Sequence, residues 1–370
     1  MIPPGPLDRG DVFNEEVAVR ARSRWLWVAM IAVLTLVVAA CGDDTGDEEG
    51  RTVIRFAFAP DPVWDYMNDN GMIVEWEEEF NTRIVTSATW DEFTYFAGGH
   101  GDIVSMGTQE VPVLEAETDI DTVTFGKYNY QRVPLLTRAD TGYQTLEDIP
   151  LGSPICVSSP VSNVGFWTVA ANQLHGLDFR VGGGDYDLIV NDHFVNPQNL
   201  LNGDCEAAAI IPEAAAPYMR TGELVAMSDG QAPFQLYTTF STVDDGQNHV
   251  MGNLFTSTKE FADANPEALE AFLVLWQRGV EAFADPAIQE EIIATYPQHF
   301  SVEEDEDIAF IQDYMAGDGN WFVDSVYLEE EWIESELAIY EFMTALNPEN
   351  QNYLEPGFET PEFIVIEPAS

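Results

Sequence analysis

The sequence predicts an α/β fold, because short apolar runs that suit strands alternate with longer amphipathic stretches that suit helices. Residues 53–59 (VIRFAFA) form one such run, which stops at a Pro-Asp-Pro turn, and residues 64–80 then carry apolar side chains at helical spacing. The chain has 370 residues, more than one small core needs and enough for two lobes.

The part of the chain before residue 150 predicts a first group of strands and helices. The turn residues between the apolar runs give the boundaries. The expected strands are 53–59, 83–87, 101–107, 122–130 and 132–137, and the expected helices are 64–80 and 90–96.

A second α/β unit is predicted to begin near Pro150. Gly176 follows its first helix, as expected of a glycine that ends a helix. Residues 235–242 and 250–256 are interpreted as the segments in which the chain crosses back. The expected strands are 153–158, 185–190, 207–211 and 224–228, and the expected helices are 164–175, 196–201 and one that starts at 214–219.

The residues from Ser257 onward predict a mainly helical portion. Asn265-Pro266-Glu267 marks one helix start, with proline in the first turn, and apolar side chains lie on one stripe of the helix that follows. The expected helices are 267–283, 286–296, 302–315 and 328–346.

The N-terminal segment has the pattern of an export signal. Three arginines lie just before an uncharged apolar run, residues 25–40, which is short for a spanning helix of about 20 residues. Residues 38–42 (VAACG) resemble the lipobox of bacterial lipoproteins, and this resemblance implies a signal peptide at 1–40 and a lipid on Cys41. An uncleaved membrane anchor is the alternative. Residues 41–51 are acidic and contain glycine, so we expect a disordered tether.

The charge balance excludes some classes of partner. The chain has 14 Lys+Arg against 65 Asp+Glu, a formal net charge of −51. Such a surface repels nucleic acid, which needs clustered basic residues, and it repels anionic lipid headgroups. We interpret the charge as a solvated surface suited to a salty habitat, and a charge suited to a cationic ligand is the alternative.

The cysteines and histidines indicate no metal, redox or catalytic motif. Cys156 and Cys205 remain once Cys41 is assigned to the lipobox, and an even pair in an exported protein favours a disulfide bond over two buried thiols. The five histidines have no metal-ligand spacing, and the sequence contains no nucleophile elbow or phosphate-binding loop.

Several short motifs resemble, in the same order, those of binding proteins for nitrate, alkanesulfonates, taurine and related solutes. The family also includes a synthase of a thiamine pyrimidine precursor. Residues 101–105 (GDIVS) resemble a strand of these proteins, and residues 159–166 with 174–177 (LHGL) resemble a loop and helix of their second lobe. Residues 201–208 (LNGDCEAA) with Pro212-Glu213, and residues 265–268 (NPEA), resemble two later motifs. The motifs span about residues 50 to 270.

This resemblance implies a two-lobed type II periplasmic-binding-protein fold with a two-strand hinge and a helical C-terminal portion. Residues 52–149 and 251–370 would form the first lobe with its C-terminal helices, and residues 150–250 would form the second lobe. The sequence departs from the family at Glu206, where an acidic residue is displaced, and at Pro60-Asp61-Pro62, where relatives have glycines. Ligand specificity therefore cannot be copied from the relatives.

The candidate ligand-binding residues lie where strands end and helices begin, which is where open α/β sheets bind ligands. Ser162 and Asn163 open a helix, where a carboxylate, sulfonate or phosphate would be favoured, or where they serve only as helix caps. Glu213 is either a ligand contact or a solvated carboxylate, and Glu110 is interpreted as a surface residue. The candidates at these corners are Asp61, Trp64, Thr108, Gln109, Ser162, Asn163, Gly165 and Glu213.

Aromatic residues near the same corners form a second set of candidates. If several line the cleft, they would stack on a ring or enclose a quaternary ammonium group. The aromatic candidates are Trp64, Trp90, Tyr128 and Phe240, with Phe166 and Trp167 nearby in the sequence.

The sequence as a whole predicts a lipid-anchored, extracytoplasmic solute-binding receptor of an ABC importer. The solute is expected to be a small polar organic molecule of the sulfonate, amine, betaine or pyrimidine class. The expected partners are this solute, an ABC permease and the membrane, reached through the lipid on Cys41, and the protein is expected to be a monomer without cofactor, metal or nucleic acid. The alternative is an exported hydrolase or precursor-synthase-like enzyme on the same fold.

Overall fold

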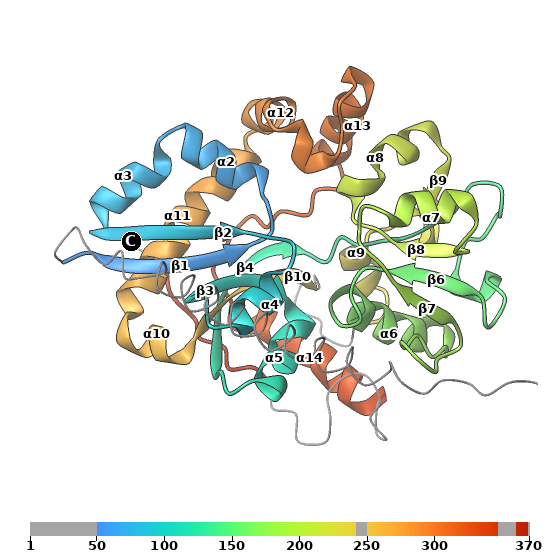
Figure 1. Ribbon diagram of the computed structural model, residues 1–370, viewed down its shortest axis with the longest axis horizontal. Coiled ribbons are helices and arrows are strands. Elements are labelled where there is room, and N and C mark those ends of the chain that lie inside the picture. The colour runs from blue at the N-terminus through green and yellow to red at the C-terminus, as the bar shows by residue number, and fades with distance from the viewer. Residues whose placement is uncertain (1–49, 242–249, 347–359, 369–370) are drawn as a thin grey trace, which may run out of the picture. The chain divides into compact units, whose positions relative to one another are not determined.

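The computed structural model describes residues 50–241, 250–346 and 360–368, and the chain from Thr52 onward forms one compact unit (Figure 1). The predicted signal peptide, Cys41 and most of the predicted tether lie outside the described residues. Within the described part of the chain, no helix is long and apolar enough to cross a membrane.

The first sheet has the strand order β2-β1-β3-β10-β4. β1 runs parallel to β2 and β3, and β10 runs antiparallel to β3 and β4. The strands are β1 (Thr52–Phe58), β2 (Thr82–Ala88), β3 (Ile103–Gly107), β4 (Thr122–Tyr130) and β10 (Met251–Thr258). Its helices are α2 (Pro62–Asp69), α3 (Met72–Glu79), α4 (Glu92–Ala97), η1 (Thr108–Glu110), α5 (Val111–Glu117), α10 (Lys259–Ala264) and α11 (Pro266–Ala284). We call this sheet and these helices the first lobe.

The alternation of side chains along β1 explains why helices cover both faces of the first sheet. Phe56 and Phe58 point to one face and pack with Trp276 of α11, whereas Ala57 points to the other face and packs with Phe96 of α4. Because both faces are buried, the central strands consist almost entirely of apolar residues.

The second sheet has the order β7-β6-β8-β5-β9, with β6 parallel to β7 and β8, and β5 antiparallel to β8 and β9 (Figure 1). The strands are β5 (Leu135–Arg138), β6 (Pro154–Val157), β7 (Asp187–Val190), β8 (Ala207–Ala209) and β9 (Leu224–Ala226). Its helices are η2 (Leu146–Asp148), α6 (Ser162–His175), α7 (Asn196–Asn202), α8 (Pro212–Thr221), η3 (Ser228–Gly230) and α9 (Pro233–Tyr237). We call this sheet and these helices the second lobe.

Two segments connect the sheets. Residues 131–134 lead from β4 to β5, and the chain returns to β10 through Val250. The Gln131 N–H donates to the Val250 carbonyl oxygen at 2.8 Å, so the two segments lie side by side. The sheets therefore divide the chain at residues 131–134, whereas the sequence placed the boundary at residue 150. β5 pairs with β8 and β9 of the second sheet, and this pairing decides its lobe. The hinge motion itself stays a prediction.

The C-terminal helices are α12 (Pro286–Thr295), η4 (Pro297–Phe300), α13 (Asp305–Ala316) and α14 (Glu330–Leu346). α14 packs on both lobes, because Trp332 lies in the core of the first lobe and Ile339 and Met343 lie in the core of the second. The hydroxyl of Tyr237 in the second lobe donates to the Ser335 carbonyl oxygen of α14 at 3.1 Å. α14 thus forms a further physical connection between the lobes.

One sequence expectation for the helices is wrong. The expected helix 64–80 is two helices, α2 and α3, because Gly71 has a φ of 76° that breaks the helical path between them. Residues 235–242 were interpreted as a segment in which the chain crosses back, and Pro233–Tyr237 is the short helix α9, which begins at a proline. Residues 242–249 lie outside the described residues.

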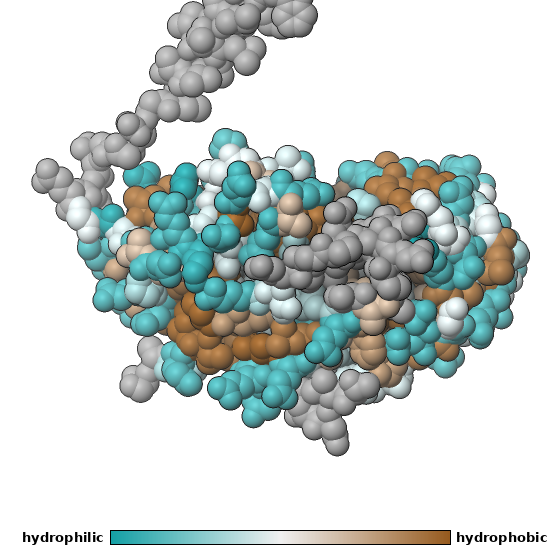
Figure 2. Space-filling model, turned by 90° about the horizontal axis from the view of Figure 1, so that it is seen from below, coloured by the Kyte–Doolittle hydropathy of each residue, from teal (hydrophilic) through white to brown (hydrophobic). Residues whose placement is uncertain are grey.

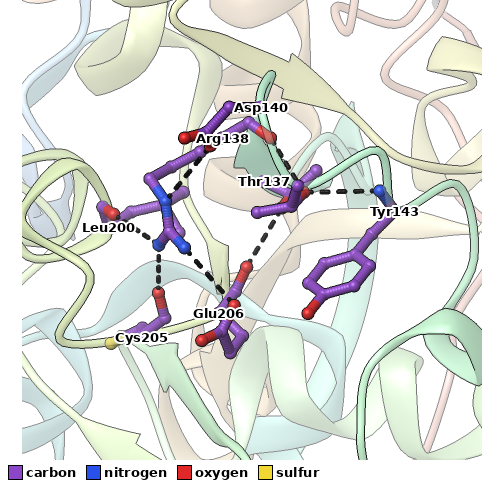
Figure 3. A network of polar contacts seen from close by, with 8 residues as sticks. Thr137, Arg138, Asp140, Tyr143, Leu200, Cys205 and Glu206 are labelled. Atoms are coloured by element: carbon purple, nitrogen blue, oxygen red, sulfur yellow. Dashed lines mark hydrogen bonds and ion pairs between the residues drawn. The ribbon is translucent and has the colours of Figure 1, made fainter.

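A network of polar contacts holds β5 against the loop that precedes β8 (Figure 3). Arg138 donates from Nη1 to the carbonyl oxygens of Leu200 and Cys205 at 3.0 and 2.9 Å, and Thr137 donates to the carbonyl oxygen of Glu206 at 3.0 Å. Cys205 forms a disulfide bond with Cys156 of β6, with the Cα atoms 5.8 Å apart. The loop is therefore joined to β5 by hydrogen bonds and to β6 by a covalent bond.

The surface agrees with the acidic composition. Figure 2 shows hydrophilic residues over much of one face, with hydrophobic residues gathered in a band. Some large apolar side chains are exposed, and two of them, Trp90 and Phe194, are 42% and 45% exposed and lie in contact with each other. Both side chains line the same cleft.

Candidate functional site

The ends of six parallel strands point to one cleft. In the first lobe, Ala59 follows β1, Trp90 follows β2, and Glu110 follows β3. In the second lobe, residues 158–162 follow β6, residues 192–194 follow β7, and Ile211 follows β8. All of these residues line a single cleft, together with Gln131, Arg132 and Val133 of the connecting segment. The cleft lies at the carboxyl ends of the parallel strands of both sheets, where α/β proteins bind ligands.

The cleft is large enough for a small organic molecule. Its volume is about 460 Å³, within the range of about 300 to 1,000 Å³ that is usual for ligand pockets. A narrower recess of about 30 Å³ adjoins it and shares the lining residues Ala59, Trp90, Arg132 and Asn253. The recess has room for a group about the size of a water molecule.

Asp61 and Tyr128 form one buried pair in the recess. Asp61 caps α2, because its Oδ1 accepts from the backbone N–H groups of Val63 and Trp64 at 2.9 and 3.0 Å. The Tyr128 hydroxyl donates to Asp61 Oδ2. Burial raises the pKa of both side chains. Both oxygens of Asp61 are therefore already used within the protein.

Arg132 and Glu213 form an ion pair between the connecting segment and the second lobe. Arg132 donates from Nε to Glu213 Oε1 at 2.8 Å, and its Nη2 lies 2.8 Å from the same oxygen. The guanidinium group also lies 5.3 Å from the ring centroid of Trp321. Burial acts to lower the pKa of Arg132, but the carboxylate of Glu213 raises the pKa overall. Arg132 is thus a fixed, neutralised cation.

Two groups in the recess have unused hydrogen-bonding capacity. Glu213 has a side chain that is 7% exposed, and its Oε2 accepts no hydrogen bond from any described residue. Among the described residues, the indole N–H of Trp276 also has no acceptor. The recess therefore offers one acceptor and one donor to a polar group that enters it.

Two carboxyl groups of the first lobe lie partly buried in the cleft. Burial raises the pKa of Glu92 to about 8, and the charge of Glu110 adds to this effect. Burial also raises the pKa of Glu110 to about 7, although the Gly107 N–H donates to its Oε2 at 2.9 Å and opposes the rise. Burial, together with Arg132, lowers the pKa of His193 to about 4, so this imidazole is neutral at neutral pH.

The N-terminus of α6 reaches the cleft beside Glu110. The Ser159 hydroxyl accepts from the Val161 and Ser162 N–H groups at 3.1 and 3.0 Å. A Cβ atom on Gly107 would lie 2.8 Å from Glu110 Oε2 and 2.8 Å from Ser162 Oγ, so a larger residue here would require one or both of these side-chain ends to move. This close approach places a carboxyl group of the first lobe next to the start of α6.

Five of the predicted site residues line the cleft or the recess. Trp90 lines both, and Ser162 lines the cleft. Asp61, Tyr128 and Glu213 line the recess. Asn163 lies in α6, but its side chain is outside the described part of the structure.

The other predicted site residues lie outside both linings, and packing explains each case. Trp64 packs in the first core against Phe58 and Trp276, and Phe240 packs against Tyr237 in the second lobe. Thr108 and Gln109 are fully buried in η1. A Cβ atom on Gly165 would lie 2.7 Å from Gln109 Cγ, so Gly165 serves the packing of α6 on η1. Phe166 and Trp167 also lie in the second core.

The sequence analysis missed several lining residues. Arg132 belongs to no motif of the sequence. Only its place at the start of the expected strand 132–137, shortly after the expected strand 122–130, could have indicated it. Glu110 was interpreted as a surface residue, yet it lines the cleft and is partly buried. Glu92 and Phe194 follow β2 and β7, so the rule that ligands bind at strand ends could have found them. Within the described residues, no group of histidine, cysteine and acidic side chains could hold a metal ion.

The arrangement of two α/β lobes around one cleft is that of periplasmic binding proteins. The structure is similar to that of the alkanesulfonate-binding protein SsuA from Xanthomonas axonopodis pv. citri bound to MOPS, with a TM-score of 0.62 and 14% identity over 81% of this chain and 94% of that chain. It is also similar to the periplasmic aliphatic sulphonate binding protein SsuA from Escherichia coli, with a TM-score of 0.60 and 13% identity over 80% and 93% of the chains. The periplasmic nitrate-binding protein NrtA from Synechocystis PCC 6803 gives a TM-score of 0.52 and 13% identity over 79% and 81%.

These comparisons confirm the predicted two-lobed type II periplasmic-binding-protein fold and the structural resemblance to sulfonate- and nitrate-binding proteins. The sequence itself matches no protein-family model and no curated protein. At 13 to 14% identity the likeness concerns the fold.

Proposed function

We propose that this protein is an extracytoplasmic, lipid-anchored solute-binding receptor of an ABC importer and is not an enzyme. The observation that carries the proposal is the cleft of about 460 Å³, which is lined by residues after three parallel strands of each lobe. A small polar organic solute of the sulfonate, amine, betaine or pyrimidine class would bind there and favour closure of the lobes. The closed form would dock on a membrane permease.

The proposed mechanism assigns the two connecting segments beside Gln131 and Val250 as the hinge. Closure would move the carboxyl ends of both sets of parallel strands toward the same solute. Each lobe would thus contribute part of the binding energy, and neither lobe alone would bind tightly. α14, which packs on both lobes, would limit the extent of this motion.

The proposed location of the protein, at the outer face of the membrane, is based on its N-terminal sequence and not on the residues that the structure describes. We propose that Cys41 carries the lipid and that residues 42–51 separate it from the folded part. Metabolic labelling with a fatty acid is expected to mark the wild type and not a Cys41→Ser variant. A wild type that takes up no label and keeps residues 1–40 would indicate an uncleaved anchor instead.

The receptor function is tested by thermal unfolding of the purified protein with a library of sulfonates, amines, betaines, pyrimidines and amino acids. A ligand that binds only the folded state adds about 2.7 kcal/mol of stability at a hundredfold excess over its Kd. The bound compound is then recovered and identified by mass spectrometry. Recovery of the unchanged compound is expected, whereas conversion of the compound would favour the alternative, a hydrolase or synthase on this fold.

A further inference from the structure

The charged side chains that line the cleft are mostly carboxylates. Arg132 is the cation among the lining residues of the cleft, and it is neutralised by Glu213, while His193 is neutral near pH 7. The carboxylates that line the cleft are Asp91, Glu92, Glu110, Glu117 and Asp192. Both lobes therefore present carboxyl groups to the same space.

A second observation concerns an acceptor in the adjoining recess. Glu213 lines the recess and is more than nine-tenths buried, and its buried Oε2 has no donor among the described residues. A buried, ionised oxygen that lacks a donor is costly, and a donor on a ligand would remove this cost. In the cleft itself, Glu92 Oε2 is likewise buried and accepts no hydrogen bond from the described part of the chain.

A third observation concerns the aromatic rings at the cleft. Trp90 of the first lobe and Phe194 of the second lobe both line it, with their ring centroids 5.4 Å apart. Both rings are more than one-third exposed although they are large and apolar. The faces of such rings attract cations, most strongly in the case of tryptophan.

The position that would suit an anion already holds a carboxyl group. The start of α6 is favourable for negative charge because helix N-termini carry a partial positive charge. Glu110 lies beside this position, close to Ser162 across Gly107. An anionic ligand placed there would meet Glu110, so the cleft disfavours an anion even though the fold is shared with sulfonate- and nitrate-binding proteins.

We propose that the solute is an organic cation, with an ammonium group held between the carboxyl groups of Glu92 and Glu110 and the ring of Trp90. The inference rests on the proposed receptor function and names the class of its solute. A donor on the ligand would reach Glu213 Oε2 in the recess. The remaining apolar part of the solute would pack against the exposed surfaces of Trp90 and Phe194.

The test uses two series of probes that share one apolar body and differ only in charge. The first series is benzylammonium, benzyl alcohol and phenylmethanesulfonate, and the second is butylammonium, butanol and butanesulfonate. Binding to the purified full-length protein is measured by thermal unfolding and by calorimetry. The expected order is cation above neutral compound above anion in both series. An order with the anion first, or no binding of either cation, would overturn the proposal.

Carboxamide variants test the assigned carboxyl groups. Glu92→Gln and Glu110→Gln are expected to weaken binding of benzylammonium about tenfold each, because each removes one charge within contact distance. A glutamine at either position preserves the shape of the side chain, and at position 110 it also keeps an acceptor for the Gly107 N–H. The matched control is Glu303→Gln, an exposed carboxylate outside both linings, which is expected to leave the affinity unchanged. Equal affinities for all three variants would contradict the assignment.

The affinity for a cation and the affinity for an anion are expected to change with pH in opposite directions, which gives an independent test. Glu92 and Glu110 hold protons up to about pH 8 and about pH 7 in the free protein. A bound cation favours their ionised forms, so binding releases protons and the affinity rises from about pH 6 to about pH 8. An anion would show the opposite trend. The groups that face them are Asp91, Glu117, Arg132, Asp192 and His193. Calorimetry in buffers of different ionisation enthalpy measures the proton release directly.

Failure of this inference and failure of the receptor proposal give different results. If a sulfonate or a neutral compound binds more tightly than the cation of its series and is recovered unchanged, the solute class is wrong and the receptor function stands. If bound compounds are converted, the receptor function is wrong whatever their charge. If cations bind in the expected order and are recovered unchanged, both proposals are supported.

Discussion

The two lobes share an architecture but contribute different chemistry to the cleft. Each lobe presents the residues that follow three parallel strands. The first lobe supplies an exposed indole and carboxyl groups at Trp90, Glu92 and Glu110, whereas the second supplies the loop 158–162 and the start of α6. The order of the strands therefore determines where the lining residues lie, while the sequences of the loops determine the chemistry that each lobe brings to the cleft.

The lobes also differ in how they are held together internally. The second lobe contains a disulfide bond and the Arg138 network, and the first lobe depends on a large aromatic core around Phe56, Phe255 and Trp276. α14 and the connecting segment both form contacts between the lobes. Arg132 in that segment is paired with Glu213 at the start of α8 in the second lobe.

The largest effect is expected where this connection is broken. Arg132→Met leaves the carboxylate of Glu213 buried without a partner, so the free energy of unfolding is expected to fall by about 3 to 5 kcal/mol. The double variant Arg132→Met with Glu213→Gln is expected to recover part of this loss, because no uncompensated charge remains. Chemical denaturation monitored by tryptophan fluorescence measures both values.

A surface ion pair of the first lobe provides the control for this prediction. Arg278 donates to Glu79 at 2.8 Å, but both side chains are about one-third or more exposed. Arg278→Met is therefore expected to cost less than about 1 kcal/mol. Equal losses for Arg132→Met and Arg278→Met would show that burial of the Arg132 pair contributes nothing to stability.

A smaller effect is expected in the second lobe alone. Replacing both Cys156 and Cys205 by alanine removes a cross-link between residues 49 positions apart, which is expected to cost about 2 to 4 kcal/mol. Hydrogen exchange can locate the loss. The amides of β6 and β8 are expected to exchange faster, while those of β1 and β3 in the first lobe keep their protection. An equal increase in both lobes would show that the two lobes unfold as one unit.

The sequence predicted the alternation of strands and helices well because this pattern depends on local spacing. The run at 53–59 and the helix start at Asn265-Pro266 both have the predicted structure, as β1 and α11. The position of β5 was assigned to the wrong lobe, because strand pairing depends on residues 70 positions away along the chain and not on the strand itself. The break at Gly71 was missed because glycine inside a helical pattern is also compatible with a continuous helix.

The candidate site was only partly predictable for a related reason. Strand ends identify the corners of the cleft, and this rule nominated Asp61, Ser162 and Glu213. The rule could not distinguish Glu110 from its two neighbours in the sequence. Thr108 and Gln109 are buried under α6 and α14, whereas Glu110 reaches the cleft. The direction of a side chain at a turn is set by tertiary packing, as the close approach at Gly107 and Gly165 shows.

The smallest effect concerns the helix that joins the two lobes. Glu336 of α14 is 1% exposed, and burial raises its pKa to about 7 against the opposing influence of the Thr108 hydroxyl and the Met251 amide. The folded protein therefore retains a proton that the unfolded chain loses near pH 4.5. The contribution of Glu336 to the free energy of unfolding is therefore fully present below about pH 4.5 and is lost as the pH rises toward about 7.

Replacing this carboxyl group isolates its contribution. The glutamine of the Glu336→Gln variant stays neutral at every pH. Between about pH 5 and about pH 7, the free energy of unfolding of this variant is therefore expected to fall by about 2 kcal/mol less than that of the wild type. Glu334→Gln, on an exposed position of the same helix, is expected to follow the wild-type curve. Urea denaturation at each pH measures the difference, and parallel curves for all three proteins would contradict the assignment. Because α14 packs on both lobes, a confirmed difference would mean that ionisation of one buried carboxyl group weakens the contact between them.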